Sequence, residues 1–408
     1  MRSPILSRLA AAAVVSAATV MVAAATVPAA AASPTAAVTV AAARPSLNEL
    51  TGAWCATAAR CIAVGVSASN PTNQATGRPL AETWNGKSWR TVPVGLPAGA
   101  TFGGLFHLAC VSAMFCVAVG YEGSGATYYE LAEIWNGRTW KPGKPPSPGG
   151  GTDDTGLAGV SCVSAKSCVA VGSYDEGGGL PGAAVEKWNG VTWTRVNPPR
   201  PAGAVYSALG SVSCTSAKYC VAVGGTYVGV LVESWNGTAW RVISAPRPSA
   251  DVTVLSGVSC VSPVSCVAVG EYFNPVGGGG GSFAETWNGK AWTMVSVRWP
   301  RGTVYTSLAD VSCASRAYCV AVGNVGENPT SSQANAGRAA AVAWNGKTWT
   351  DMSVPGPAKG KASWFRGVWC GAAASCAAVG YTGAVNASTS TGLSGFWNGK
   401  SWKLTGAI

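Results

Sequence analysis

The sequence predicts an all-β protein, a seven-bladed β-propeller with four antiparallel strands per blade. Three observations lead to this prediction. A pair of cysteines separated by five residues occurs seven times, a Trp-Asn-Gly-x-x-Trp motif also occurs seven times, and the two alternate strictly along the chain. The repeat is close to 50 residues long, and no segment shows a helical period. Repeats of this length that lack helices are typical of propellers, whose blades are four-stranded sheets.

The N-terminus has the features of an export signal. Two arginines accompany an Ala/Val-rich segment from Leu9 to Val27, and three alanines before Ser33 form a small-residue cleavage site. We therefore expect a signal peptide at 1–32, a flexible Ala/Pro/Thr leader at 33–46 and the propeller at 47–408. The alternative, an uncleaved membrane anchor, is disfavoured because the segment contains few lipophilic side chains. The expected protein is secreted and extracellular, with no membrane span once the signal is removed.

Each repeat contains four short segments with strand character. The first ends at the first cysteine, the second begins at the other cysteine, the third runs into Trp-Asn-Gly, and the fourth follows it. Because Asn-Gly tolerates positive φ at both positions, we expect Asn85-Gly86 to form a two-residue hairpin loop. That loop would place Trp84 opposite Lys87 and Glu82 opposite Trp89.

A glutamate precedes the Trp-Asn-Gly motif by two positions in five of the repeats. It occurs as Glu82, Glu133, Glu186, Glu233 and Glu285. A glutamate that recurs in five blades fits a structural role in the repeat better than a role in one active site. We therefore interpret these residues as contacts between blades rather than as catalytic groups.

The cysteines indicate disulfides rather than a metal site. Exported proteins meet an oxidising compartment, and two cysteines on either side of a tight turn can face each other across antiparallel strands. A zinc site would require two pairs to converge, yet each pair belongs to its own repeat. We therefore expect no metal and seven intrablade disulfides: Cys55–Cys61, Cys110–Cys116, Cys162–Cys168, Cys214–Cys220, Cys260–Cys266, Cys313–Cys319 and Cys370–Cys376.

The repeat resembles those of kelch-type and Asp-box β-propellers of the bacterial secreted type, over roughly residues 47–408. As in kelch units, an apolar second strand ends in glycine, an aromatic residue precedes the turn into strand four, and a tryptophan follows that turn. The chain departs from both patterns. The kelch double glycine survives only as Gly224-Gly225, and Trp84 stands where the aspartate of an Asp-box would be. The resemblance implies a propeller fold and transfers no active site.

Length varies at one place in the repeat. The step from the second cysteine to Trp-Asn-Gly ranges from 15 to 25 positions, whereas the step from the last tryptophan to the next cysteine is always 20 to 22. The variable segment is the loop between strands two and three. Because strands alternate in direction, these loops share one rim of the disc with the crossovers between blades. Variable loops on a constant scaffold are where binding specificity usually resides.

Aromatic and acidic residues gather where these loops leave strand two. Tyrosines offer stacking surfaces, and carboxylates accept hydrogen bonds from hydroxyl groups, so the combination suits a sugar or a polar peptide. The alternative is that the tyrosines cap strand ends and the acids solvate loops; Glu176, Asn274, Asn324, Glu327 and Asn328 lie nearby. The candidate ligand-binding residues are Tyr121, Glu122, Tyr174, Asp175, Tyr227, Glu271, Tyr272 and Tyr381.

Basic residues gather at the opposite rim, in or just after the Asn-Gly hairpins. Such a rim attracts polyanions without sequence preference, or simply keeps a weakly charged surface soluble. The formal net charge is +11, but no basic run is present, so we expect no nucleic-acid partner. The basic residues are Lys87, Arg90, Arg138, Lys141, Arg195, Arg241, Lys290, Lys347, Lys400 and Lys403.

The composition restricts catalysis. One histidine in 408 residues excludes sites that require two imidazoles. His107 and Asp310 are unusual for their position, three residues before the first cysteine, but blades two and six lie nearly opposite each other across the ring. We expect no cofactor, no catalytic residues and a monomer. The predicted function is non-catalytic binding of an extracellular glycan, cell-envelope component or protein partner; the alternative is a glycan-active hydrolase or lyase.

Overall fold

The computed structural model describes residues 47–70, 73–146, 155–175, 181–227, 229–250, 252–273, 280–326, 337–359, 361–384 and 389–406. The predicted signal peptide and leader lie outside the described residues. No helix in this part of the chain is long and apolar enough to cross a membrane.

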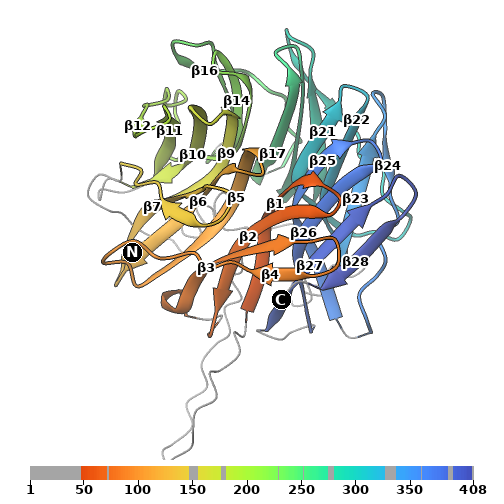
Figure 1. Ribbon diagram of the computed structural model, residues 1–408. Helices are drawn as coiled ribbons and strands as arrows, with labels where there is room; N and C mark the ends of the chain where they lie inside the picture. Colours follow the sequence, from red (N-terminus) through yellow and green to blue (C-terminus); the bar gives the residue numbers. More distant parts are fainter. Residues whose placement is uncertain are drawn as a thin grey trace, which may run out of the picture.

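The chain folds into seven four-stranded antiparallel sheets arranged as blades in a ring (Figure 1). This confirms the predicted seven-bladed β-propeller. The strands of each sheet pair in chain order, so every blade is built from one continuous segment. The N-terminal and C-terminal strands therefore do not share a blade, as the repeat boundaries predict.

The bounds of the strands follow the repeat. Blade 1 contains β1 (Leu47–Thr57), β2 (Arg60–Ala68), β3 (Gly77–Trp84) and β4 (Trp89–Thr91), with a short 3-10 helix η1 (Gln74–Thr76) before β3. Blade 2 contains β5 (Phe102–Ser112), β6 (Phe115–Ser124), β7 (Thr127–Trp135) and β8 (Trp140–Pro142). Blade 3 contains β9 (Gly156–Ser164), β10 (Ser167–Tyr174), β11 (Gly182–Trp188) and β12 (Trp193–Arg195). Blade 4 contains β13 (Ser207–Ser216), β14 (Tyr219–Thr226), β15 (Gly229–Trp235) and β16 (Trp240–Val242).

The remaining three blades repeat the same plan. Blade 5 contains β17 (Val252–Ser262), β18 (Ser265–Phe273), β19 (Gly280–Trp287) and β20 (Trp292–Val295). Blade 6 contains β21 (Tyr305–Ser315), β22 (Tyr318–Gly326), β23 (Arg338–Trp344) and β24 (Trp349–Asp351). Blade 7 contains β25 (Lys361–Ala372), β26 (Ser375–Ala384), β27 (Ser390–Trp397) and β28 (Trp402–Gly406).

The hydrophobic core consists of seven clusters, one between each pair of neighbouring blades. The first strand of each blade contacts the first strands of both neighbours, so these strands surround the ring axis. Five residues before its first cysteine, each blade contributes one large apolar side chain that is at most 1% exposed. These are Leu50, Leu105, Leu157, Leu209, Leu255, Leu308 and Phe365. Side-chain packing, rather than a shared sheet, therefore joins one blade to the next.

The ring closes by packing between blades 7 and 1. The ring of Phe396 stacks on that of Trp84, with centroids 5.1 Å apart. The indole Nε1 of Trp89 donates a hydrogen bond of 2.9 Å to the Ser394 hydroxyl. Trp54 and Trp369 meet edge to face near the axis, with centroids 6.0 Å apart. Closure thus rests on aromatic contacts and a buried hydrogen bond.

All seven predicted disulfides are confirmed. In every blade the two cysteines occupy opposed positions on the first and second strands, with Cα atoms 3.9 to 4.1 Å apart. Among the described residues, no cysteine is free. Each disulfide spans the short turn at the end of its own hairpin, and none of the seven joins two blades.

The predicted register of the Asn-Gly hairpin is wrong. Trp84 pairs with Trp89, and Glu82 pairs with Thr91, so the loop contains four residues rather than two. The Asn85 side-chain oxygen accepts hydrogen bonds of 2.9 Å from the backbone N–H groups of Lys87 and Ser88. This side-chain bridge stabilises a longer loop, in which only Gly86 needs positive φ (92°). The two indoles then lie opposite each other, with ring centroids 5.5 Å apart.

The first tryptophan of the motif also holds the disulfide turn. The Trp84 indole Nε1 donates a hydrogen bond of 3.2 Å to the Ala58 carbonyl, inside the turn that the disulfide spans. A Cβ on Gly86 would come within 3.0 Å of the Ala59 side chain, so the two turns of a blade lie against each other. The same bond, 3.0 to 3.3 Å long, joins Trp135 to Ala113, Trp188 to Ala165, Trp235 to Ala217, Trp287 to Pro263 and Trp397 to Ala373. We call the rim that carries both turns the hairpin rim, and the opposite one the variable-loop rim.

Serines in the first strands connect neighbouring blades. The hydroxyl of the serine before the first cysteine accepts a hydrogen bond from the cysteine N–H of the next blade. These bonds are 2.9 to 3.0 Å long and join Ser161 to Cys214, Ser213 to Cys260, Ser259 to Cys313 and Ser312 to Cys370. In each Ser-Cys dipeptide, the serine therefore links its blade to the next one, while the cysteine forms the disulfide within its own blade.

We predict that Trp235→Phe destabilises the protein more than Trp240→Phe. Both changes shrink a buried aromatic side chain in blade 4, but only Trp235 loses a hydrogen bond to a turn, worth about 1 kcal/mol. The Trp240 indole N–H has no hydrogen-bond partner among the described residues. Urea unfolding of the two variants under oxidising conditions measures the difference. Equal midpoints would contradict a stabilising role for the tryptophan-turn hydrogen bond.

Candidate functional site

All seven first strands have a bulge at the same position, but the residue at the bulge differs among the blades. Every first strand shifts register at the residue four positions before its first cysteine. A bulge redirects the side chain that it carries. Blades 2 and 7 have large residues at the bulge, Phe106 and Arg366. The other five blades have small residues there: Thr51, Ala158, Gly210, Ser256 and Ala309.

Phe106 and Arg366 each contact a tyrosine on the adjacent second strand. The Phe106 ring stacks on Tyr121, with centroids 5.2 Å apart. Arg366 donates a hydrogen bond of 3.3 Å to the Tyr381 hydroxyl, and Trp364 stacks on the same tyrosine at 4.9 Å. The two bulges therefore support two aromatic surfaces, one in blade 2 and one in blade 7.

Acidic and phenolic groups from blades 1, 5 and 6 complete this arrangement. Buried Glu49 of blade 1 interacts electrostatically with Tyr121 of blade 2 and Tyr381 of blade 7. The Tyr305 hydroxyl of blade 6 lies 3.4 Å from the Glu271 carboxylate of blade 5. We call this set the axial cluster; it consists of Glu49, Phe106, Tyr121, Glu271, Tyr305, Trp364, Arg366 and Tyr381.

The electrostatics of the axial cluster keep its phenols neutral and its arginine charged. Burial raises the pKa of Tyr121 to about 12, with further contributions from Tyr128 and Glu49. Burial also raises the pKa of Tyr305 and of Tyr381, so all three phenols stay protonated at neutral pH. Burial by itself lowers the pKa of Arg366, but the nearby Tyr381 and Glu49 outweigh this effect. The net pKa is raised above its ordinary value, so the guanidinium stays charged. The cluster thus presents hydrogen-bond donors, stacking surfaces and one half-buried cation.

The predicted tyrosines separate into two groups because side chains alternate along a strand. Tyr121, Glu271 and Tyr381 directly follow the glycine of strand two and occupy the same position in three blades. Tyr174 and Tyr272 lie one residue further and point to the other face. Tyr174 covers the Arg195 guanidinium at 4.4 Å, and Tyr272 packs against the core between blades 4 and 5.

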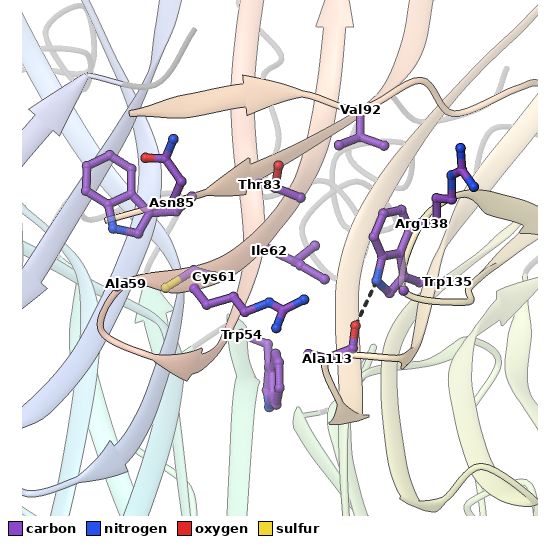
Figure 2. A pocket seen from close by; sticks show the side chains of 13 residues that line it. Trp54, Ala59, Cys61, Ile62, Thr83, Asn85, Val92, Ala113, Trp135 and Arg138 are labelled. Atoms are coloured by element: carbon purple, nitrogen blue, oxygen red, sulfur yellow. Dashed lines mark hydrogen bonds between the residues drawn. The ribbon is translucent and has the colours of Figure 1, made fainter. Parts of the chain in front are cut away.

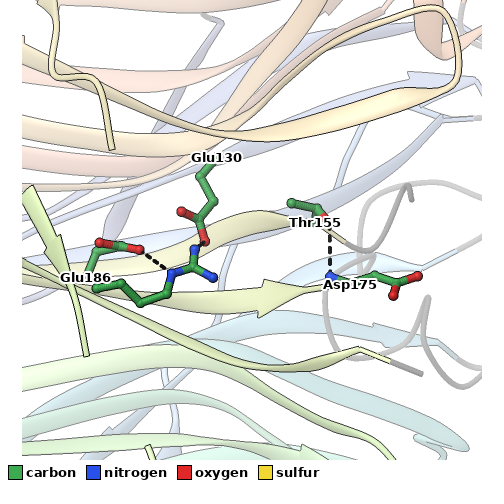
Figure 3. A network of polar contacts seen from close by, with 5 residues as sticks. Glu130, Thr155, Asp175 and Glu186 are labelled. Atoms are coloured by element: carbon green, nitrogen blue, oxygen red, sulfur yellow. Dashed lines mark hydrogen bonds and ion pairs between the residues drawn. The ribbon is translucent and has the colours of Figure 1, made fainter. Parts of the chain in front are cut away.

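The other predicted site residues lie outside the axial cluster. Tyr227 is 47% exposed at the turn after β14. Glu122 is half-buried, and burial raises its pKa. Asp175 is buried, and its backbone N–H donates a hydrogen bond of 3.2 Å to the Thr155 hydroxyl (Figure 3). Of the nearby polar residues, Asn324 is buried, whereas Glu176, Asn274, Glu327 and Asn328 lie outside the described residues.

Arg195 does not belong to an exposed basic rim, contrary to the sequence prediction. It inserts between blades 2 and 3, where its guanidinium pairs with Glu186 at 2.8 Å and with Glu130 (Figure 3). Two buried carboxylates share this one cation. Burial raises the pKa of Glu130 to about 8, because Arg195 only partly offsets the cost of a second charge. The group is a structural bridge between blades.

The repeated glutamates are fully buried. Glu82, Glu133, Glu186, Glu233 and Glu285 are all 0% exposed. Burial raises the pKa of Glu133, Glu233 and Glu285 to about 8. Among the described residues, the carboxylate oxygens of Glu233 and Glu285 have no hydrogen-bond partner, so the neutral acid is the favoured form.

His107 and Asp310 form contacts between blades instead of an acid–base pair. The Asp310 carboxylate accepts a hydrogen bond of 2.9 Å from the Val368 N–H of blade 7. His107 hydrogen-bonds to the backbone of Val160 in blade 3, and burial lowers its pKa to about 4. Ser211, at the equivalent position of blade 4, accepts a hydrogen bond of 3.3 Å from the Val258 N–H of blade 5. These residues therefore belong to the network that joins first strands.

Sequence reasoning missed Glu49, Phe106, Tyr305, Trp364 and Arg366. A signal for two of them was present, because Phe106 and Arg366 stand out when the seven repeats are compared four positions before the first cysteine. This difference between the repeats points to a site only once the bulge at that position is known.

No protein-family model matches the chain, and no curated protein matches it in sequence. The fold is similar to that of a polysaccharide lyase, an ulvan lyase bound to a glucuronate–sulfated rhamnose ligand, with 10% identity, 88% of this chain and 97% of that chain covered, and a TM-score of 0.52. It is also similar to YCF48 bound to a D1 peptide, with 12% identity, coverages of 83% and 91%, and a TM-score of 0.49. A third similar structure is the SapL1 lectin bound to α-methyl fucoside, with 13% identity, 72% of this chain and 92% of that chain covered, and a TM-score of 0.40. These likenesses concern the fold.

The buried glutamates predict that stability falls as pH rises. Glu233 has a folded-state pKa of about 8 against an ordinary value of 4.5, so its contribution is fully present below pH 4.5 and is lost as pH rises through 8. Each unit of pKa difference corresponds to about 1.4 kcal/mol. Glu233→Gln should therefore match the wild type near pH 5 and exceed its stability at pH 9 by at least about 1 kcal/mol. Thermal unfolding across this pH range tests it; the same pH slope in both proteins would contradict it.

Proposed function

We propose that this protein is a secreted, non-catalytic binding protein that holds an extracellular or cell-envelope glycan at its variable-loop rim. The axial cluster is the recognition centre. The observation that carries the proposal is the pair of aromatic surfaces, Phe106–Tyr121 and Trp364–Tyr381, at the rim where all loop-length variation occurs.

The chemistry of the axial cluster suits a sugar. Aromatic faces stack on the apolar face of a pyranose ring, while phenol, carboxylate and guanidinium groups hydrogen-bond to its hydroxyls. Blade 1 contributes the buried Glu49, which interacts electrostatically with the tyrosine of each aromatic surface and so couples the two surfaces. Polar groups that converge between apolar surfaces are the usual composition of small-molecule sites.

The raised tyrosine pKa values support binding without turnover. A general base needs a pKa near the working pH, whereas burial holds the pKa of Tyr121 near 12 and raises those of Tyr305 and Tyr381 as well. The alternative of a glycan-active hydrolase or lyase draws on the Tyr305–Glu271 pair beside Arg366. Release of shortened or unsaturated products from a bound glycan would establish that alternative.

The disulfides support the proposed compartment. Seven disulfides are characteristic of proteins exposed to an oxidising environment. Together with the predicted signal sequence at 1–32, they support export. We propose a monomer that uses no cofactor and no metal, and whose partner is a glycan, envelope polymer or extracellular protein rather than nucleic acid.

We predict that the double variant Trp364→Ala/Tyr381→Ala loses at least about tenfold in affinity for the bound glycan, because each stacking contact contributes on the order of 1 kcal/mol. A glycan array identifies the glycan, and a pull-down with purified peptidoglycan covers insoluble envelope material. Tyr227→Ala is the matched control, since it removes an exposed tyrosine from the same rim. Undiminished binding by the double variant would contradict the assignment of the axial cluster.

A further inference from the structure

A cavity of about 630 Å³ lies on the hairpin rim between blades 1 and 2 (Figure 2). We call it the blade 1–2 groove and define it by Trp54, Arg60 and Thr83 from blade 1 and by Trp135 and Arg138 from blade 2. Figure 2 shows Trp135 and Arg138 on one wall, with Trp54 and Thr83 on the facing wall. The groove is on the opposite rim from the axial cluster.

At five of the other six junctions, a larger side chain occupies one of the equivalent positions. At the position of Thr83, Phe396 stacks on Trp84 at 5.1 Å, and Lys187 lies over Trp235 at 4.2 Å. At the position of Arg60, Tyr219 packs against the core between blades 4 and 5 together with Trp287, and Tyr318 packs against the core between blades 6 and 7 together with Trp397. Between blades 2 and 3, Phe115 and Ile134 pack into the core.

The blade 1–2 junction lacks such a filling residue. Thr83 has a short side chain and Arg60 is exposed, and both line the cavity beside the buried Trp135. The junction between blades 5 and 6 also has small residues, Ser265 and Thr286, but Arg316 stands there in place of Ala113.

The groove has a consistent charge. Its lining contains Arg60 and Arg138 and no acidic residue, and neither arginine forms an ion pair within the described part of the chain. A guanidinium presents a planar fork of donors that matches carboxylate and sulfate oxygens. The volume lies within the range of small-ligand sites, about 300–1,000 Å³.

We propose that the blade 1–2 groove binds an anionic sugar residue, a uronate or a sulfated sugar, as a second site distinct from the axial cluster. The ring lies between Trp54 and the edge of Trp135, which is itself only 6% exposed. Arg60 and Arg138 pair with the carboxylate or sulfate. The filled junctions support this assignment, because they show that the same space accepts a flat ring, as with Phe396, beside the first tryptophan of the motif.

Calorimetric titration with defined oligosaccharides tests the proposal. The probes are trigalacturonate, a chondroitin sulfate hexasaccharide and, as the neutral comparison, maltohexaose. We expect at least one of the two anionic probes to bind and the neutral one not to, with affinity falling as NaCl rises from about 50 to 500 mM. Arg60→Ala/Arg138→Ala should weaken binding at least tenfold. Thr83→Phe should abolish it by filling the groove, and blade 7 already tolerates phenylalanine at this position.

Three control variants test whether binding depends on this groove in particular. Arg241→Ala removes an exposed arginine elsewhere on the protein, and Thr286→Phe makes the same size change between blades 5 and 6; both should bind the anionic probes normally. Trp364→Ala/Tyr381→Ala should also bind them normally, so failure of the axial proposal would leave this one intact. The proposal is overturned if neither anionic probe binds, if Thr83→Phe binds undiminished, or if Arg241→Ala weakens binding as much as the Arg60/Arg138 pair.

Discussion

The hydrogen bond from the motif tryptophan to the disulfide turn is the interaction on which the rest of the structure depends. In blades 1 to 5 and in blade 7, this indole N–H reaches a carbonyl in the turn that its own blade's disulfide closes. The bond brings the two turns of a blade together. It also orients the tryptophan pair, whose rings form part of the core between blades. A hydrogen bond within each blade thus positions the tryptophans that pack between neighbouring blades around the ring.

This constraint explains why function would concentrate on the opposite rim. Disulfide, tryptophan and Asn-Gly loop together require fixed spacings, so the hairpin rim repeats with little change in length. The loops between strands two and three carry none of these contacts and vary freely in length. Near the axis, the bulges of blades 2 and 7 place Phe106 and Arg366 where other blades have smaller residues. The blade 1–2 groove lies on the hairpin rim, where Thr83 leaves a space that larger side chains occupy at five other junctions.

Much of the fold could be predicted from the sequence because the repeats report long-range structure through local spacing. Paired cysteines and a recurring turn motif define blade number, strand order and disulfide pairing without any knowledge of contacts. The hairpin register failed for a local reason: the Asn85 side chain bonds two backbone groups and stabilises a longer loop than Asn-Gly alone suggests. Arg195 was misplaced because its partner Glu130 comes from another blade, and the sequence does not reveal that pairing.

The candidate site was only partly predictable. The glycine that ends strand two marks where the chain leaves the core, so Tyr121, Glu271 and Tyr381 could be found. Proximity to that glycine does not determine which face a side chain occupies, and one residue of offset sent Tyr174 and Tyr272 into the interfaces between blades. Glu49 and Tyr305 contribute through contacts across blades, which depend on the closed ring.

Hydrogen–deuterium exchange of the protein with and without its tightest-binding neutral glycan tests the central claim most directly, because it compares both rims in one experiment. The account predicts slower exchange in segments 119–128 and 361–384, at the variable-loop rim, and unchanged exchange in the Asn-Gly hairpins at 84–91 and 235–242. Slower exchange at the hairpins with no change at the variable-loop rim would contradict it.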